Sequence, residues 1–173
     1  MVFGVIVGTG TGAGIVIDGK VLSGANAIAG EWGHNPLPWL SDDERPGLPC
    51  YCGKNGCIET WLSGTGLARN FELKHQRAII AEQIVEGAAK GDLECEQAIS
   101  EYEDQMARGL SHVINILDPD VIVLGGGMSN IKRLYQNVPK LWQQYVFSDY
   151  ISTRLLPPDH CDSSGVRGAA WLS

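Results

Sequence analysis

Three cysteines within eight positions constrain this chain more than any other sequence feature. They lie in the segment Cys50-Tyr51-Cys52-Gly53-Lys54-Asn55-Gly56-Cys57, where two glycines permit a tight turn that lets the sulfur atoms converge. The whole chain holds five cysteines, an odd number. In a reducing compartment such a cluster favours metal binding over disulfide formation. The alternative is a group of buried cysteines that bind no metal.

A histidine from the same irregular stretch is expected to complete the metal site. Zinc prefers four tetrahedral nitrogen and sulfur ligands. His34 lies in the segment Gly30-Glu31-Trp32-Gly33-His34, close to the cysteines in sequence. The competing histidines are His75 in a polar segment, His112 within a helical pattern, and His160. Four protein ligands leave no coordination position for water, so the pattern predicts a structural zinc bound by His34, Cys50, Cys52 and Cys57.

The order of the predicted elements indicates an α/β domain. Strands are predicted over residues 2–7, 15–17 and 20–22, the last two joined by a turn at Asp18-Gly19. Residues 23–55 show no periodicity, so a function or a metal should hold them. An apolar stripe at spacings of three and four predicts a long helix over 94–117. Further elements are predicted as helices over 59–71 and 79–89, a strand over 121–124, a helix from Asn130 to about 147, a strand over 151–156 and a terminal helix over 164–172.

Charge and hydropathy exclude some classes of partner. The formal net charge of −7 argues against a surface for nucleic acid or for an anionic membrane, because both need an excess of Lys and Arg. The apolar start at Val2–Val7 lacks the basic flank of a signal peptide. No apolar stretch approaches the ~20 residues that span a bilayer. These features predict a cytoplasmic protein without nucleic-acid or membrane partners.

Two glycine-rich turns are candidate nucleotide contacts. Gly8-Thr9-Gly10-Thr11-Gly12 lies between two predicted strands, where backbone N–H groups and threonine hydroxyls can cradle phosphate oxygens. Gly125-Gly126-Gly127 follows a buried strand, at a position where α/β sheets bind ligands, and can lie against an adenine or a ribose. The plain alternatives are a hairpin turn for the first segment and a tight strand-to-helix connection for the second.

Two glutamates flank the predicted metal site. Glu31 precedes His34 and Glu59 follows Cys57, so a bound zinc should bring the two carboxylates together. Two acceptors at a fixed spacing suit hydrogen bonds to neighbouring sugar hydroxyls. The alternatives are a solvated charge for either glutamate and, for Glu59, a carboxylate stabilised by a helix N-terminus. The acidic run 42–44 is expected to be a solvated loop, and no aspartate of the chain is a persuasive general base.

Taken together, these motifs resemble a known family signature. Gly30-Glu31-Trp32-Gly33-His34 followed by Cys50-x-Cys52-Gly53-x-x-Gly56-Cys57-x-Glu59 resembles that of the ROK family (repressors, open reading frames and kinases). The two glycine turns look like the phosphate and adenosine motifs of that family. The resemblance covers essentially the whole chain. It is closest to bacterial fructokinases over 30–39, 115–130 and 162–171, with N-acetylglucosamine kinases as the nearest competitors.

The resemblance implies an ATP-dependent hexose kinase with an actin-like ATPase (ribonuclease H-like) fold. The zinc-binding insertion would cover about residues 30–60, and the enzyme would use ATP and Mg²⁺ and form a homodimer. The matched positions are Glu31, His34 and Glu59 for the sugar, His34, Cys50, Cys52 and Cys57 for zinc, and both glycine turns for the nucleotide.

One departure from the family pattern shapes the functional expectation. A family kinase carries an Asp-x-Gly-Gly-Thr strand and an Asn-Asp pair, whose Asp takes the proton from the attacking sugar hydroxyl. Neither motif occurs in these 173 residues. Because phosphoryl transfer depends on positioning and on the base that orients the nucleophile, the chain is expected to be inactive alone. It is expected to be the C-terminal α/β domain, residues 1–173, of a two-domain sugar kinase, with helix 164–173 returning to the other domain.

Fructose is the expected substrate, with N-acetylglucosamine or glucose as the alternative within the same family. An alternative of another class is the sugar-sensing domain of a ROK-type transcription repressor. A purely structural zinc-knuckle interaction domain is the third interpretation, and it would leave the glycine turns and Glu31 without a role.

Overall fold

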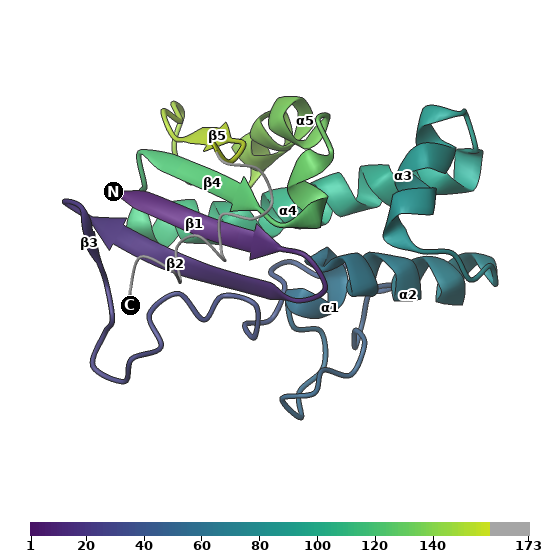
Figure 1. Cartoon of the computed structure of the whole chain (residues 1–173), viewed down its shortest axis with the longest axis horizontal. Coiled ribbons are helices and arrows are strands. Elements are labelled where there is room, and N and C mark those ends of the chain that lie inside the picture. Colours follow the sequence, from purple (N-terminus) through teal and green to yellow (C-terminus); the bar gives the residue numbers. More distant parts are fainter. Residues whose placement is uncertain (160–173) are drawn as a thin grey trace.

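A five-stranded mixed sheet organises the part of the chain that the computed structural model describes, residues 1–159. Strands β1 (Val2–Val7), β2 (Thr11–Ile17) and β3 (Lys20–Val21) form an antiparallel meander. On the other side of β1, strand β4 (Val121–Gly125) pairs in parallel, and β5 (Arg154–Leu156) pairs in parallel with β4. The strand order is β3-β2-β1-β4-β5 (Figure 1). Since β1 and β4 are parallel, their carboxyl ends reach the same edge of the sheet.

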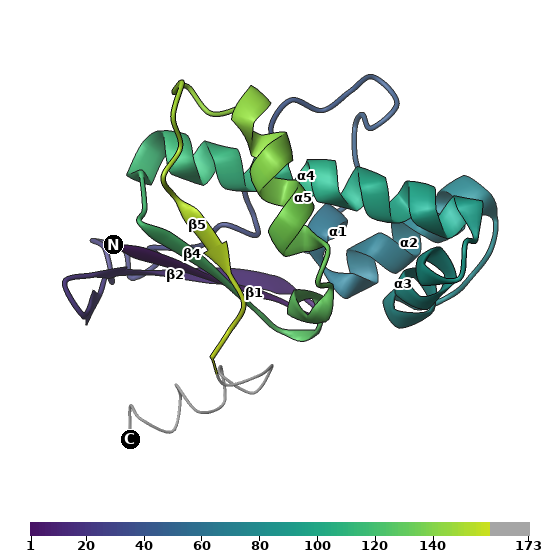
Figure 2. The same ribbon diagram turned by 90° about the horizontal axis from the view of Figure 1, so that it is seen from above.

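Within residues 1–159, five α-helices accompany the sheet. They are α1 (Glu59–Leu62), α2 (Gly64–His75), α3 (Ala81–Ala89), α4 (Leu93–Leu117) and α5 (Leu134–Leu141). Two short 3₁₀ helices follow β4 and α5, η1 (Gly127–Asn130) and η2 (Trp142–Gln144). Figure 2 shows α4 and α5 on one face of the sheet, with α2 and α3 beyond its end. No helix of the described residues is long and apolar enough to cross a membrane.

The apolar stripe of α4 forms the centre of the core. Leu117 of the predicted stripe is partly buried against this core, and the other five residues of the stripe are buried in it: Ile99, Tyr102, Met106, Leu110 and Val113. The alternate residues Phe3, Val5 and Val7 of β1 are also buried, as expected for a strand with one covered face. Tyr102 of α4 donates its hydroxyl hydrogen to the Leu62 carbonyl at 2.7 Å, which fixes α1 against α4. The long helix and the positions of the predicted strands are therefore confirmed, although β2 begins earlier than predicted, at Thr11, and β5 begins later, at Arg154.

Two predicted helices differ from the structure. The helix predicted over 59–71 is broken at Ser63, whose hydroxyl accepts the Gly66 N–H and so begins α2 as a separate helix. The helix predicted from Asn130 to about 147 is present but begins later and is shorter. The Asn130 side chain bonds back to the Gly127 carbonyl and ends η1, and α5 spans only Leu134–Leu141. The predicted terminal helix 164–172 lies outside the described residues.

The irregular stretch between β3 and α1 is held by buried side chains. Trp32 packs edge-on against Phe3, with ring centroids 6.1 Å apart, and its indole N–H donates to the Gly109 carbonyl at 3.3 Å. Leu37 is also buried in the main core. The non-periodic segment is thus anchored to both β1 and α4.

Glu44 gives a second anchor and corrects the expectation of a solvated loop for this residue, whereas Asp42 and Asp43 are exposed as expected. Its carboxylate lies 2.6 Å from Nη2 of Arg108 on α4, and the two side chains are only 14% and 6% exposed. Gln105 and the Ser41 N–H also donate to this carboxylate. Burial alone would raise the pKa of Glu44, but the hydrogen bonds from Arg108, Ser41 and Gln105 outweigh it and lower that pKa to about 2.

Removing this charge should destabilise the fold in a pH-dependent way. Glu44→Gln leaves Arg108 with only Asp104 as a charged partner, so we expect the free energy of unfolding to fall by about 3 kcal/mol at pH 7. Because the folded pKa lies below the unfolded value, the wild-type advantage should be complete above about pH 5 and shrink as the pH falls toward 2. Urea unfolding at several pH values measures both effects.

The matched control is Glu86→Gln, which breaks an exposed pair with Lys90 on α3. It should change the free energy of unfolding by less than about 0.5 kcal/mol. A Glu44→Gln variant as stable as this control would contradict the proposed anchor.

Candidate functional site

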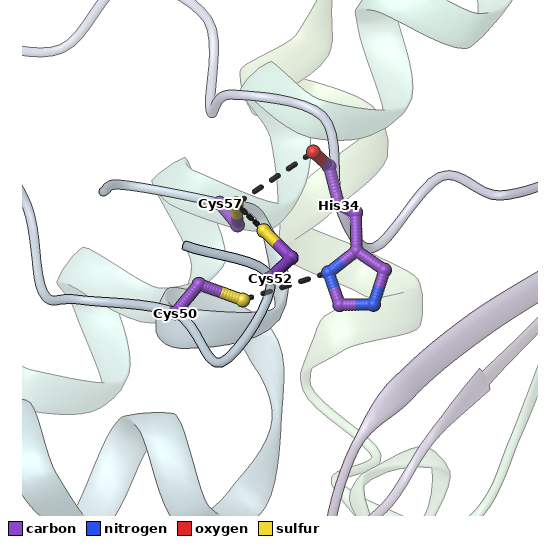
Figure 3. A group of neighbouring side chains, drawn as sticks. All are labelled: His34, Cys50, Cys52 and Cys57. Atoms are coloured by element: carbon purple, nitrogen blue, oxygen red, sulfur yellow. Dashed lines mark hydrogen bonds between the residues drawn. The ribbon is translucent and has the colours of Figure 1, made fainter. Parts of the chain in front are cut away.

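The side chains of His34, Cys50, Cys52 and Cys57 converge as the sequence predicts. Their potential ligand atoms all lie within 4.8 Å of one another (Figure 3). The Sγ atoms of Cys52 and Cys57 are 3.6 Å apart, and Cys50 Sγ lies 3.5 Å from Nδ1 of His34. Tetrahedral zinc, with bonds of ~2.3 Å to sulfur and ~2.0 Å to nitrogen, separates its ligands by about 3.8 Å and about 3.5 Å. The donor set and its spacing therefore fit one zinc ion.

Backbone hydrogen bonds build this arrangement from two separate segments. The cysteine turn is closed by the Cys50 N–H, which donates to the Lys54 carbonyl at 2.8 Å, and by the Gly53 N–H, which donates to the Cys50 carbonyl at 3.0 Å. The His34 segment joins it through an isolated antiparallel bridge between Pro36 and Cys57. The imidazole thus reaches the thiols because the two segments are already paired.

The thiols differ in their readiness to ionise. Burial, followed by hydrogen bonds with Cys52 and Cys50, raises the pKa of Cys57 to about 12. The backbone N–H of Lys54 lowers the pKa of the exposed Cys52. Because a thiol binds a metal as the thiolate, a cation here must displace the Cys57 proton, and its affinity should rise with pH.

Tyr51 was not identified from the sequence as a site residue. Its side chain is 83% exposed, and its hydroxyl oxygen lies 2.7 Å from Nε2 of His34. Desolvation, and then the charges of Glu59, Cys50 and Glu31, raise the pKa of this hydroxyl. Tyr51 therefore lies in the electrostatic field of the Glu31 and Glu59 carboxylates. Its position between two ligand cysteines was the only sequence feature that could have indicated it.

Glu59 joins the cysteine turn and the His34 segment to the start of β2. Its carboxylate oxygen Oε2 accepts the Thr11 N–H at 3.0 Å, and its own N–H donates to the Gly33 carbonyl at 2.9 Å. Gly33 is required at this position, because a Cβ atom there would lie 2.1 Å from the Thr11 carbonyl oxygen. Although Glu59 opens α1, its carboxylate thus has a specific partner outside that helix.

The first glycine turn is shorter than predicted. Thr11 and Gly12 belong to β2, so the connection itself is formed by Gly8, Thr9 and Gly10. Thr9 and Gly10 are exposed. The Thr11 hydroxyl is buried without a hydrogen-bond partner among the described residues.

The second glycine turn lies at the same edge of the sheet. Gly125 ends β4, Gly126 has a φ angle of +80°, and Gly127 begins η1. A Cβ atom on Gly126 would lie 2.5 Å from the Val7 carbonyl oxygen, so this turn packs directly against the end of β1. The Gly8 carbonyl in turn accepts the Gly64 N–H at 2.7 Å.

Glu31 lies on the surface of the irregular segment. Its backbone carbonyl accepts a hydrogen bond from the Asn35 side chain at 2.7 Å. Its carboxylate makes no hydrogen bond within residues 1–159 and is therefore available to a ligand.

Comparison with known proteins places these features in one family. The whole chain, residues 1–173, matches the ROK family. It is 38% identical over 176 aligned residues to the N-acetyl-D-glucosamine kinases of Vibrio atlanticus and Photobacterium profundum, covering 99% of this chain. The chain spans 58% of the length of these relatives.

Solved structures agree on the fold. A ROK family glucokinase from Streptomyces griseus, in complex with glucose and AMPPNP, has a TM-score of 0.86 at 26% identity over 99% of this chain and 60% of that chain. The ROK hexokinase from Thermus thermophilus has a TM-score of 0.83 at 27% identity, over 98% and 57%. A ROK family transcriptional regulator has a TM-score of 0.75 at 26% identity, over 90% and 41%.

A single thiol substitution should abolish stable metal binding. We expect Cys57→Ser to reduce the zinc content of purified protein from about one ion per chain to well below one, because a four-ligand site that loses a thiolate loses its closed tetrahedral sphere. Elemental analysis measures the zinc, and thiol titration counts the free cysteines.

The control is Cys95→Ser, which changes a buried free cysteine on α4 outside the cluster and should leave the zinc content unchanged. Wild-type protein that contains no zinc, with all five thiols reactive, would contradict the predicted metal centre.

Proposed function

This chain belongs to the ROK family, and from that premise we propose that it forms the sugar-binding and nucleotide-binding part of an ATP-dependent hexose kinase. One observation carries the proposal. The Glu59 carboxylate, an acceptor for sugar hydroxyls, is hydrogen-bonded to Thr11 at the base of the candidate phosphate turn. Phosphoryl transfer requires the acceptor hydroxyl and the transferred phosphate to be held close together. The contact between Glu59 and this turn supports that arrangement.

The residues of the phosphate turn would have separate roles. Thr9 and Gly10 are exposed, so their backbone and the Thr9 hydroxyl are available to phosphate oxygens. Thr11 already uses its N–H for Glu59, so it would support the carboxylate rather than the phosphates. Gly125, Gly126 and Gly127, at the same edge of the sheet, would lie against the adenosine, and Gly8 and Gly12 would permit the bends on either side of the turn. ATP would be used with Mg²⁺.

Glu31, His34 and Glu59 would contact the hexose. Glu31 has a free carboxylate, and His34 turns Nε2 away from the cysteines. The four-ligand site would hold a structural zinc. Bound there, zinc supplies a rigid link between the His34 segment and the cysteine turn, from which α1 and Glu59 begin.

The identity of the hexose is part of the proposal. The local motifs favour fructose, whereas the relatives described above are N-acetyl-D-glucosamine kinases and a glucokinase. The relatives thus support a hexose in general and favour N-acetylglucosamine or glucose over fructose. Differences between hexoses depend on the shape of the whole pocket, to which residues outside this chain would contribute.

The general base would not come from this chain. Within the described residues, the Glu59 carboxylate already accepts a hydrogen bond from Thr11, and Glu44 is paired with Arg108. The Asp-containing motifs of the family kinases are also missing from the sequence. The remaining part of a two-domain enzyme would supply the base, and the functional unit would be a soluble homodimer in the cytoplasm.

A hexose panel on the full-length gene product tests this function. Fructose, glucose, mannose and N-acetylglucosamine are offered with MgATP, and ADP release is followed. We expect one hexose to be phosphorylated at a rate far above the others, and we expect the 173-residue chain alone to give no turnover, since it lacks the base. Normal turnover by this chain alone would contradict the assignment of the base, and failure of every hexose would contradict the kinase proposal.

Removing the Glu59 charge in the full-length gene product should lower kcat/KM for the hexose without disrupting the site. In Glu59→Gln the amide oxygen can still accept the Thr11 N–H, but it no longer offers a charged acceptor to the sugar. Hydrogen bonds to charged groups contribute ~1.5–3 kcal/mol, so kcat/KM for the hexose should fall about 10- to 100-fold. The control Glu72→Gln, an exposed glutamate on α2, should have no effect. An equal loss in both variants would count against a sugar contact at Glu59.

A repressor domain is the second candidate, because a family transcriptional regulator shares the fold. This function would require a DNA-binding segment in the same polypeptide and operator binding that responds to the sugar. A full-length product that binds its own promoter DNA, releases it on addition of a hexose and does not hydrolyse ATP would favour this candidate over the kinase.

A further inference from the structure

Tyr51 occupies an unusual position beside the predicted metal centre. It lies between the ligands Cys50 and Cys52, and its ring meets that of His34 edge-on, with centroids 4.9 Å apart and an interplanar angle of 89°. A side chain that is 83% exposed could direct its hydroxyl to solvent. Instead the hydroxyl lies 2.7 Å from His34 Nε2. The cysteine turn therefore fixes the backbone of a residue that in turn contacts the fourth ligand.

The two ring nitrogens of His34 face different partners. Nδ1 lies 3.5 Å from Cys50 Sγ and faces the three sulfurs, whereas Nε2 points away from them (Figure 3). A histidine binds a metal through a nitrogen lone pair, so Nδ1 must be free of hydrogen, and in the neutral ring Nε2 then carries it. That Nε2–H needs an acceptor, and Tyr51 Oη is its only hydrogen-bond partner within residues 1–159.

We propose that Tyr51 is a positioning residue of the metal centre, whose hydroxyl accepts the His34 Nε2–H and holds the imidazole in the tautomer and orientation that direct Nδ1 to zinc. Outer contacts of this kind fix the ring of a ligating histidine and raise its basicity. The inference rests on the zinc centre proposed above and concerns the sugar-free protein, in which Tyr51 rather than a hexose is the partner of His34 Nε2. The proposal gives a role to the exposed hydroxyl of Tyr51, whose position packing alone does not explain.

The zinc affinity of Tyr51→Phe tests this role. The substitution keeps the ring and its edge-on contact and removes only the hydroxyl. We expect the dissociation constant for zinc, measured by competition with a chromophoric chelator, to rise at least about 10-fold. The matched control is Tyr150→Phe, a tyrosine that is 81% exposed and whose hydroxyl makes no hydrogen bond within the described part of the chain. It should leave the dissociation constant unchanged.

A double-mutant cycle separates action through His34 from a general effect on the cysteine turn. His34→Cys replaces the imidazole with a fourth thiolate, which zinc also accepts. In this background Tyr51→Phe should no longer change zinc affinity, because no imidazole remains to be oriented. The same loss in both backgrounds, or no loss in the wild-type background, would overturn the proposal.

The tautomer of His34 gives a readout that does not depend on the folding of the His34→Cys variant. In zinc-loaded protein labelled with ¹⁵N-histidine, we expect the wild-type spectrum to show a protonated Nε2 with a hydrogen-bonded proton protected from exchange. Tyr51→Phe should make that proton exchange faster. An unchanged exchange rate in Tyr51→Phe would overturn the proposal, and wild-type protein that binds no zinc would overturn both the proposal and the metal centre. Neither measurement uses sugar or ATP, so a failed kinase assay leaves both results interpretable.

Discussion

The pairing of residues 33–35 with the start of α1 is the constraint on which the rest of the site depends. The Gly33 carbonyl accepts the Glu59 N–H at 2.9 Å, and the Asn35 carbonyl accepts the Ile58 N–H at 2.8 Å. These two bonds bring the imidazole of His34 within reach of the cysteine turn. They also place Glu59 so that its carboxylate reaches Thr11, because Gly33 lets the segment lie directly on that part of β2. The predicted metal ligands, the Glu59 carboxylate and the start of β2 are thus brought together by one short stretch of backbone pairing.

The long irregular segment before α1 is stabilised by anchors of different physical character. Trp32 and Leu37 bury apolar surface in the main core, and Glu44 forms an ion pair with Arg108 that is largely shielded from solvent. A metal bound to the cysteine turn would add a third anchor. Since a segment without helix or strand leaves many backbone groups unpaired by secondary structure, several independent anchors are needed to hold one conformation. The two anchors that the structure describes hold this segment through contacts that do not involve the cysteine turn.

Features encoded by neighbouring residues could be predicted from the sequence, and features encoded by distant ones could not. The strand at residues 2–7 and the apolar stripe of α4 are local features, and both were predicted correctly. The density of thiols is local too, and the structure brings these thiols together with His34, while the binding of zinc stays a prediction. The burial of Glu44 depends on Arg108, which is 64 residues away, and the contact of Glu59 depends on Thr11, which is 48 residues away. The helix predicted from Asn130 begins only at Leu134, because the Asn130 side chain closes the preceding 3₁₀ turn, a choice that propensity alone does not determine.

The geometry also explains how a structural zinc, which would take no part in the reaction itself, would still affect it. Cys57 is separated from Glu59 by Ile58 alone, and Ile58 is completely buried. A displacement of the cysteine turn would therefore be transmitted through a fully buried residue to the carboxylate that accepts the Thr11 N–H. Catalytic groups tolerate only small displacements before activity falls. If the proposed function holds, the zinc would fix the distance between the sugar hydroxyl that accepts the phosphate and the nucleotide. The cysteine turn and the glycine turns would then form one functional unit.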